Sequence, residues 1–288
     1  MITTLSAGLS IGAIYAIVAI GYNIVFVASK VFNFAQAQFL MIGTFIALDA
    51  GARYGLPIPL AILLCAIVGA VIGALEEILA IRRLAGKGEH NELVTTVGVS
   101  TLMAGAALVI WGPEPIRTPY LTGLGQIQVF GSAVGVIDLA ITAIAILLAS
   151  GVAVVTRRSM IGLASLASSE DRDAAMLRGI DVKRMALGAF VVAGALVAAT
   201  APFVGAKTYA TYHLGDGLAV KAFVALAIGG FGSYLGALIG GFIVGLLEML
   251  GARFLGSEWQ DISVFVLLLI VLLVLPKGLF GRTKERVV

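Results

Sequence analysis

The chain has 288 residues, of which 60% are hydrophobic and only 12% are charged, and its net charge is +3. A soluble globular domain carries about a quarter charged residues, so this composition excludes an ordinary soluble domain. The mean hydropathy of +1.08 indicates a chain that spans a membrane. At roughly 20 residues per crossing, we predict an all-α, polytopic bundle of about eight or nine membrane segments, folded as one transmembrane domain over residues 1–288.

The apolar segments follow one another in chain order, with a long loop rich in glycine and proline after the fourth. They cover residues 5–28, 33–48, 58–81, 93–111, 137–156, 185–204, 219–250 and 262–275. Glycines spaced by four residues predict close helix packing at Gly8/Gly12, Gly69/Gly73, Gly236/Gly240 and Gly241/Gly245.

Lysine and arginine predict the orientation of the chain, because loops on the cytoplasmic side carry an excess of both. With the N-terminus outside, the inner loops contain Lys30, Arg82, Arg83, Lys87, Arg157, Arg158, Arg172, Arg178, Lys183, Arg184, Lys277, Arg282, Lys284 and Arg286. The outer side keeps only Arg53, Arg117, Lys207, Lys221 and Arg253. We therefore predict an N-out, C-in topology. Charges placed in such loops indicate topology rather than binding to nucleic acid.

Two segments differ from ordinary crossings. The segment 33–48 is short and begins with polar residues, and Asn33 with Gln36 matches a capping box. Glycines at 229, 230, 232 and 236 interrupt the segment 219–250. Paired interruptions in two halves of a chain indicate a transport path, so we expect Asn33, Gln36, Gln38, Gly229, Gly230 and Gly232 to line it. The alternative for Asn33 and Gln36 is that they cap an ordinary helix at the cytoplasmic face.

The most polar stretch, at about residues 162–180, predicts a short cytoplasmic helix. Ser168 can cap its start with Asp171 three positions on, and Gly179 suits the position after its end. A helix this short is marginal alone in water, so it needs a surface to dock on. We expect it to dock on a cytoplasmic partner through Ser168, Glu170, Asp171, Ala174, Leu177 and Gly179. The alternative is a loop helix that docks only on its own bundle.

The sequence lacks the residue patterns that several chemical functions require. There is no phosphate-binding G-x-x-x-x-G-K-[ST] loop, and the two histidines, His90 and His213, join no zinc-type cluster. We therefore expect no enzyme activity, metal or cofactor in this chain. Acids within the membrane segments are few, namely Glu76, Glu77 and Glu248, and the first two lie close enough to Arg82 and Arg83 to pair with them. This scarcity argues against a stand-alone secondary transporter or channel with inverted repeats, which stays the alternative.

Six motifs in order resemble the permeases of the branched-chain amino-acid ABC importer family. Residues 8–16 resemble its G-L-x-x-G-x-x-Y-A opening, and residues 33–36 its N-F-A-[HQ] element. Glu170-Asp171, with Ala174 and Gly179, resembles its coupling loop. The block from Lys221 to Ala237, Glu248 after it, and residues 276–281 resemble the family's remaining motifs. Where the family has Gly-Glu after N-F-A-[HQ], this chain has Ala37-Gln38.

The resemblance implies a permease subunit of an ATP-driven importer in the bacterial cytoplasmic (inner) membrane. Its partners would be a second permease subunit of different sequence, two cytoplasmic ATPase subunits and an extracytoplasmic substrate-binding protein. ATP and Mg²⁺ would bind to the ATPase subunits, and the helix at 162–180 would couple them to the permease. The substrates would be branched-chain amino acids or related small solutes such as amides, urea and carboxylates, moved by alternating access.

Overall fold

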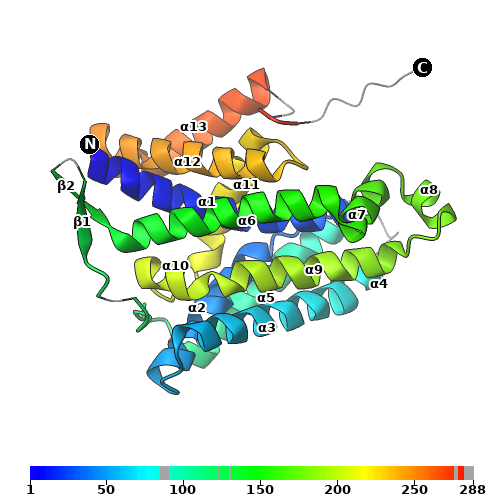
Figure 1. Cartoon of the computed structure of the whole chain (residues 1–288), viewed down its shortest axis with the longest axis horizontal. Helices are drawn as coiled ribbons and strands as arrows, with labels where there is room; N and C mark the ends of the chain where they lie inside the picture. Colours follow the sequence, from blue (N-terminus) through cyan, green and yellow to red (C-terminus); the bar gives the residue numbers. More distant parts are fainter. Residues whose placement is uncertain (85–90, 122, 130, 276–277, 282–288) are drawn as a thin grey trace. The chain divides into compact units, whose positions relative to one another are not determined.

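The computed structural model describes residues 1–84, 91–121, 123–129, 131–275 and 278–281, most of them in helices (Figure 1). The helices are α1 (Ile2–Ser29), α2 (Gln36–Ala52), α3 (Ile58–Glu76), the π-helix η1 (Glu77–Ile81), α4 (Arg82–Leu84), α5 (Asn91–Trp111), α6 (Val136–Arg158), α7 (Met160–Glu170), α8 (Arg172–Leu177), α9 (Val182–Ala199), α10 (Ala201–Thr208), α11 (Leu214–Gly229), α12 (Tyr234–Phe254) and α13 (Trp259–Val274). Lys87, His90, Pro276, Lys277, Arg282, Lys284 and Arg286 lie outside the described residues.

Six described helical stretches are long and apolar enough to cross a membrane. They are Ile2–Ser29, Ile58–Ile81, Asn91–Trp111, Val136–Arg158, Val182–Ala199 and Tyr234–Phe254, and α13 is a shorter apolar helix. These helices confirm a polytopic helical membrane protein. The count of eight or nine segments and the N-out, C-in orientation stay predictions.

The long loop after α5 contains a small hairpin that the sequence analysis did not predict. Strands β1 (Gln126–Val129) and β2 (Ser132–Gly135) pair antiparallel, with Gln126 opposite Gly135 (Figure 1). Gly131 has φ of 74° between the strands, a backbone conformation that glycine adopts without strain.

The predicted segments 185–204 and 219–250 are each two helices. The first divides at Thr200, and Pro202 lies in the first turn of α10, where its missing N–H leaves no hydrogen bond unmade. The second divides between α11 and α12, where Gly230 and Gly232 have φ of 95° and 86°. The predicted interruption is therefore confirmed at Gly229, Gly230 and Gly232, whereas Gly236 lies inside α12 and does not interrupt it.

The chain divides into two compact units, each composed of separate stretches. Unit 1 contains Met1–Asn23, Gly125–Ala153 and Val220–Val288, and unit 2 contains Ile24–Leu124 and Val154–Ala219. The single transmembrane domain over residues 1–288 stays a prediction.

Glycines bring helix backbones into direct contact within each unit. In unit 2, a Cβ on Gly69 of α3 would overlap with the carbonyl oxygen of Gly194 of α9, and a Cβ on Gly194 would overlap with that of Gly69. In unit 1, Gly12 of α1 and Gly241 of α12 approach each other in the same way. Small residues allow this approach in lipid, where no hydrophobic effect drives helices together. The packing role predicted for the spaced glycines is confirmed at these positions.

Replacing Gly194 by alanine is expected to lower the free energy of unfolding by about 1–3 kcal/mol, because the new methyl group forces α3 and α9 apart. Gly188 in the same helix has no atom within 4 Å of an added Cβ, so Gly188→Ala is the matched control. Thermal unfolding of the detergent-solubilised protein measures both variants. Equal midpoints for the two variants would contradict the close α3–α9 packing.

Candidate functional site

The start of α2 is held by side chains rather than by a capping box. Asn33 Oδ1 accepts a hydrogen bond from the Ala35 N–H at 2.9 Å, which keeps residues 33–35 out of the helix. The helix therefore begins at Gln36, and its N-cap residue, Ala35, makes no side-chain capping bond. The predicted capping box is wrong, because Gln36 lies at the first helical position and donates instead to the carbonyl of Ala193 in α9, at 3.1 Å.

Glu76 and Glu77 at the end of the third segment have different partners. Glu77 forms an ion pair with Arg82 at 2.7 Å, as the sequence analysis considered. Glu76 accepts instead from Asn33 Nδ2 at 2.8 Å. The backbone changes from α-helix to π-helix at this point, a feature that is frequent at functional sites.

Buried oxygen atoms without a hydrogen-bond donor concentrate near the start of α2. Asn33, Gln36 and Gln38 are fully buried, and Glu76 is 4% exposed. Among the described residues no donor reaches Oε1 of Gln36, Gln38 or Glu76. An unsatisfied buried polar atom costs about 1–3 kcal/mol, so these three oxygens are candidate acceptors for a bound water or solute.

Gln38 is hydrogen-bonded to two polar residues, Ser100 and Asp216, that were not predicted as site residues. Its Nε2 donates to Asp216 Oδ1 of α11 at 2.7 Å and to Ser100 Oγ of α5 at 3.0 Å. All three residues belong to unit 2. The position of Asp216 beside an apolar segment was the only signal in the sequence, and nothing local connected it with Gln38.

At the glycine break between α11 and α12, in unit 1, hydrogen bonds from other parts of the unit satisfy backbone groups. Asn23 of α1 accepts from the Gly232 N–H at 2.8 Å and donates to the Ser233 carbonyl at 2.9 Å. The carbonyl of Gly229 at the end of α11 accepts from the Phe280 N–H at 3.1 Å. Because these bonds satisfy backbone groups that the break frees, irregular backbone is tolerated here. Its role in lining a path stays a prediction, as does that of Asn33, Gln36 and Gln38.

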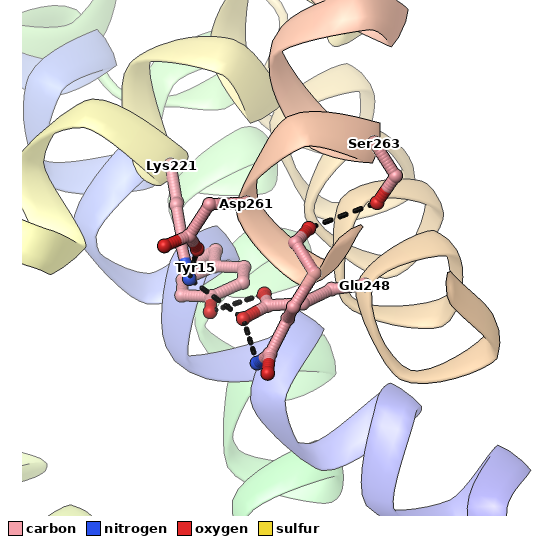
Figure 2. Close-up of polar contacts among 6 residues, drawn as sticks. Tyr15, Lys221, Glu248, Asp261 and Ser263 are labelled. Carbon is pink, nitrogen blue, oxygen red and sulfur yellow. Dashed lines mark hydrogen bonds and ion pairs between the residues drawn. The ribbon is translucent and has the colours of Figure 1, made fainter. Parts of the chain in front are cut away.

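Glu248 of α12 is the centre of a second polar cluster, which lies in unit 1 (Figure 2). Its carboxylate accepts from Tyr15 Oη at 2.5 Å, from Lys221 Nζ at 2.6 Å and from Gln260 Nε2 at 2.6 Å. Lys221 also pairs with Asp261 at 2.9 Å, and the Asp261 side chain is 68% exposed. The buried carboxylate thereby joins four helices, α1, α11, α12 and α13, and its hydrogen bonds give it a structural role.

The polar stretch predicted at about residues 162–180 contains parts of two helices, α7 and α8, instead of one helix that begins at Ser168. Ser168 lies inside α7, where its hydroxyl donates to the Ala164 carbonyl at 2.9 Å. The N-cap of α8 is Asp171, which accepts from the N–H groups of Asp173 and Ala174 at 3.0 and 2.9 Å. The predicted cap at Ser168 is wrong, because α7 continues through Glu170 and leaves the first free N–H groups beyond Asp171.

The end of α8 agrees with the sequence analysis. Gly179 has φ of 83°, its N–H donates to the Met176 carbonyl, and the Ile180 N–H donates to the Ala175 carbonyl. This pair of bonds is the Schellman motif expected of a glycine after a helix end. Ala174 and Leu177 are exposed, Leu177 by 89%, whereas Ala175 is buried. The short helix therefore packs through one side and leaves an apolar edge uncovered among the described residues. Docking through Ser168, Glu170, Asp171, Ala174, Leu177 and Gly179 stays a prediction.

The family model and the relatives described next are all transport permeases. A family model described as "Branched-chain amino acid transport system / permease component" matches residues 4–275. The high-affinity branched-chain amino acid transport system permease protein BraD of Pseudomonas aeruginosa is 32% identical, covering 96% of this chain and 94% of that protein. LivH of Escherichia coli, described in the same words, is 30% identical over the same shares. The probable branched-chain amino acid transport permease LivH of Methanocaldococcus jannaschii is 26% identical over 92% and 88%.

The apolar helices and these matches define a multi-pass membrane permease, a transport protein rather than an enzyme. The chain belongs to the family of branched-chain amino acid transport system permease components. The family resemblance derived from the six sequence motifs is confirmed.

Proposed function

We propose that this chain is a membrane-spanning permease subunit of an ATP-driven ABC importer in the bacterial cytoplasmic (inner) membrane. Its substrates are branched-chain amino acids or related small solutes such as amides, urea and carboxylates. The observation that carries the proposal is the family match, which covers residues 4–275. Because the chain has no phosphate-binding loop, the energy must come from other subunits.

The partners in the proposal are a second, different permease subunit, two cytoplasmic ATPase subunits and an extracytoplasmic substrate-binding protein. ATP and Mg²⁺ bind to the ATPase subunits, and this chain binds no cofactor. Helix α8 is the docking element for an ATPase subunit, since its exposed apolar edge at Ala174 and Leu177 gives a small helix a surface to bury. ATP binding then shifts the permease between outward-open and inward-open states, and each state binds the substrate-binding protein and the ATPases differently.

The start of α2 and the glycine break between α11 and α12 are the proposed lining. Asn33, Gln36 and Gln38 supply amide groups, and acceptor oxygens of Gln36 and Gln38 have no donor among the described residues. Gly229, Gly230 and Gly232 supply backbone without side chains. Such polar groups suit solutes that carry hydrogen-bond donors, which all the proposed amino-acid and amide substrates do.

Co-purification tests the assembly. The tagged chain is expressed with the genes that neighbour it, and the complex is isolated in detergent. We expect an ATPase subunit, a second permease and a binding protein to be encoded there, and the first two to remain in the complex. Recovery of the chain alone, with no ATPase encoded beside it, would favour the stand-alone transporter instead.

A further inference from the structure

Three residues of unit 2, Gln38, Ser100 and Asp216, bring two acceptor oxygens to one amide group. The Nε2 atom of Gln38 in α2 donates both to Asp216 Oδ1 at 2.7 Å and to Ser100 Oγ at 3.0 Å. The carboxylate of Asp216 and the hydroxyl of Ser100 therefore lie beside the same Gln38 amide, whose own acceptor is Oε1. The three residues come from α11, α5 and α2, so no single helix terminus produces the arrangement.

The cluster contains more acceptors than donors. The side chain of Gln38 is fully buried, and no donor among the described residues reaches its Oε1 atom. Asp216 is exposed, and no lysine or arginine of the described residues pairs with it. The buried amide oxygen is costly unless a donor binds to it, and the exposed carboxylate beside the amide is free to form an ion pair with a cationic ligand.

Close packing against Gly215 holds the Gln38 amide in place. A Cβ on Gly215 would overlap with the Oε1, Cδ and Nε2 atoms of Gln38. The start of α11 thus lies directly against the amide, and glycine is the residue that permits the contact. The acceptor geometry is therefore set by backbone as well as by hydrogen bonds.

An apolar cluster lies farther along the same elements. Its buried members are Met41, Phe45, Leu48, Ala107 and Ala210, and Ile42, Ala104, Trp111, Ile116, Tyr212 and Leu214 pack against it. In α2 and α5 these residues begin one turn after Gln38 and Ser100. Acceptor oxygens followed by a buried aliphatic and aromatic cluster correspond in chemistry to the two parts of an aliphatic amino acid, its ammonium group and its side chain.

We propose that Gln38, Ser100 and Asp216 form the subsite that binds the ammonium group of an aliphatic amino acid as it passes through the permease. This inference rests on the proposed transport function. An ammonium group has three donors and no acceptor, which matches one carboxylate, one amide oxygen and one hydroxyl oxygen. Its bond to Asp216 is charge-assisted and hence the strongest of the three.

The proposed subsite explains why an amide rather than a carboxylate suits position 38. A glutamate at position 38 would place a second carboxylate beside Asp216. Two adjacent carboxylates repel each other, whereas an amide donates to Asp216 and leaves one negative charge for one ammonium. The double substitution Gln38→Glu/Asp216→Asn would therefore move the carboxylate from α11 to α2 and keep one amide and one carboxylate in the pair.

The test uses the complete complex in proteoliposomes with saturating binding protein and radiolabelled leucine. Asp216→Asn is expected to lower ATP-driven leucine uptake about tenfold or more, while ATP hydrolysis stimulated by the binding protein continues. The double variant Gln38→Glu/Asp216→Asn is expected to restore most of the uptake, because the charge returns on the other side of the same hydrogen bond. Glu258→Gln, an acid-to-amide change at an exposed residue of unit 1, is the control and keeps wild-type uptake.

Wild-type uptake in Asp216→Asn would overturn the subsite, and so would a double variant that assembles fully yet stays as inactive as Asp216→Asn. If Asp216→Asn does not assemble into the complex, Ser100→Ala is tested instead. We expect this variant to lower leucine uptake several-fold, and unchanged uptake would contradict the inference. Failure of the proposed function gives a different result, since the wild-type complex would then show no ATP-driven leucine uptake.

Discussion

Glu248→Ala is expected to lower the free energy of unfolding by about 3–5 kcal/mol, the range for removing one partner of a buried ion pair. The substitution removes the carboxylate 2.6 Å from the Lys221 ammonium, which is 20% exposed and then keeps only the exposed Asp261 as its partner. It also removes the acceptor of the Tyr15 hydroxyl. Four helices lose their common contact, so we expect a large fall in the unfolding midpoint in detergent.

Asp261→Asn provides the control for Glu248. Asp261 pairs with the same lysine, but its side chain is 68% exposed, and exposed ion pairs contribute about 0–1 kcal/mol. This variant is therefore expected to unfold close to the wild-type midpoint. Similar midpoints for Glu248→Ala and Asp261→Asn would show that Glu248 does not hold the helices of unit 1 together.

If α8 docks on an ATPase subunit as proposed, Leu177→Asp is expected to separate that subunit from the permease. Leu177 is 89% exposed at the apolar edge of α8, and an interface anchor of this kind contributes about 2 kcal/mol or more, which corresponds to about thirtyfold in affinity. We expect the ATPase subunits to be lost on size-exclusion chromatography, and ATP-driven uptake with them.

Ile161→Asp is the matched control for Leu177→Asp. Ile161 of α7 is 73% exposed and receives the same charge outside the apolar edge of α8. The complex is expected to stay intact in this variant. Retention of the ATPase by Leu177→Asp, or equal loss in both variants, would remove α8 as the docking element.

Local patterns predicted the helical elements and one helix end well. The π-helix η1 extends α3 to Ile81, so the stretch Ile58–Ile81 agrees with the segment predicted from hydropathy. Gly179 ends α8 as expected, because a left-handed residue after a helix depends only on neighbouring backbone. The cap at Ser168 was wrong because Ser168 and Asp171 are both good capping residues. The choice between them depends on where α7 ends, which the local sequence does not determine.

The polar clusters could not be predicted, because they depend on residues far apart in the sequence. Tyr15 and Glu248 lie 233 positions apart, and Gln38 and Asp216 lie 178 apart. Gln38 was identified because polar residues at the start of a membrane segment are unusual. Its partners Ser100 and Asp216 follow from the packing of α2 against α5 and α11, which no local pattern contains. Asn33 likewise was expected to cap a helix and instead bonds to Glu76.

Uptake by the reconstituted complex tests the central claim most directly. Proteoliposomes contain this chain, its partner permease and either active ATPase subunits or ATPase subunits that cannot hydrolyse ATP, and the ligand-loaded binding protein is supplied on the outer face. The proposed function predicts accumulation of radiolabelled leucine only with active ATPase and ATP. Accumulation that persists with the inactive ATPase and follows an imposed ion gradient would contradict it.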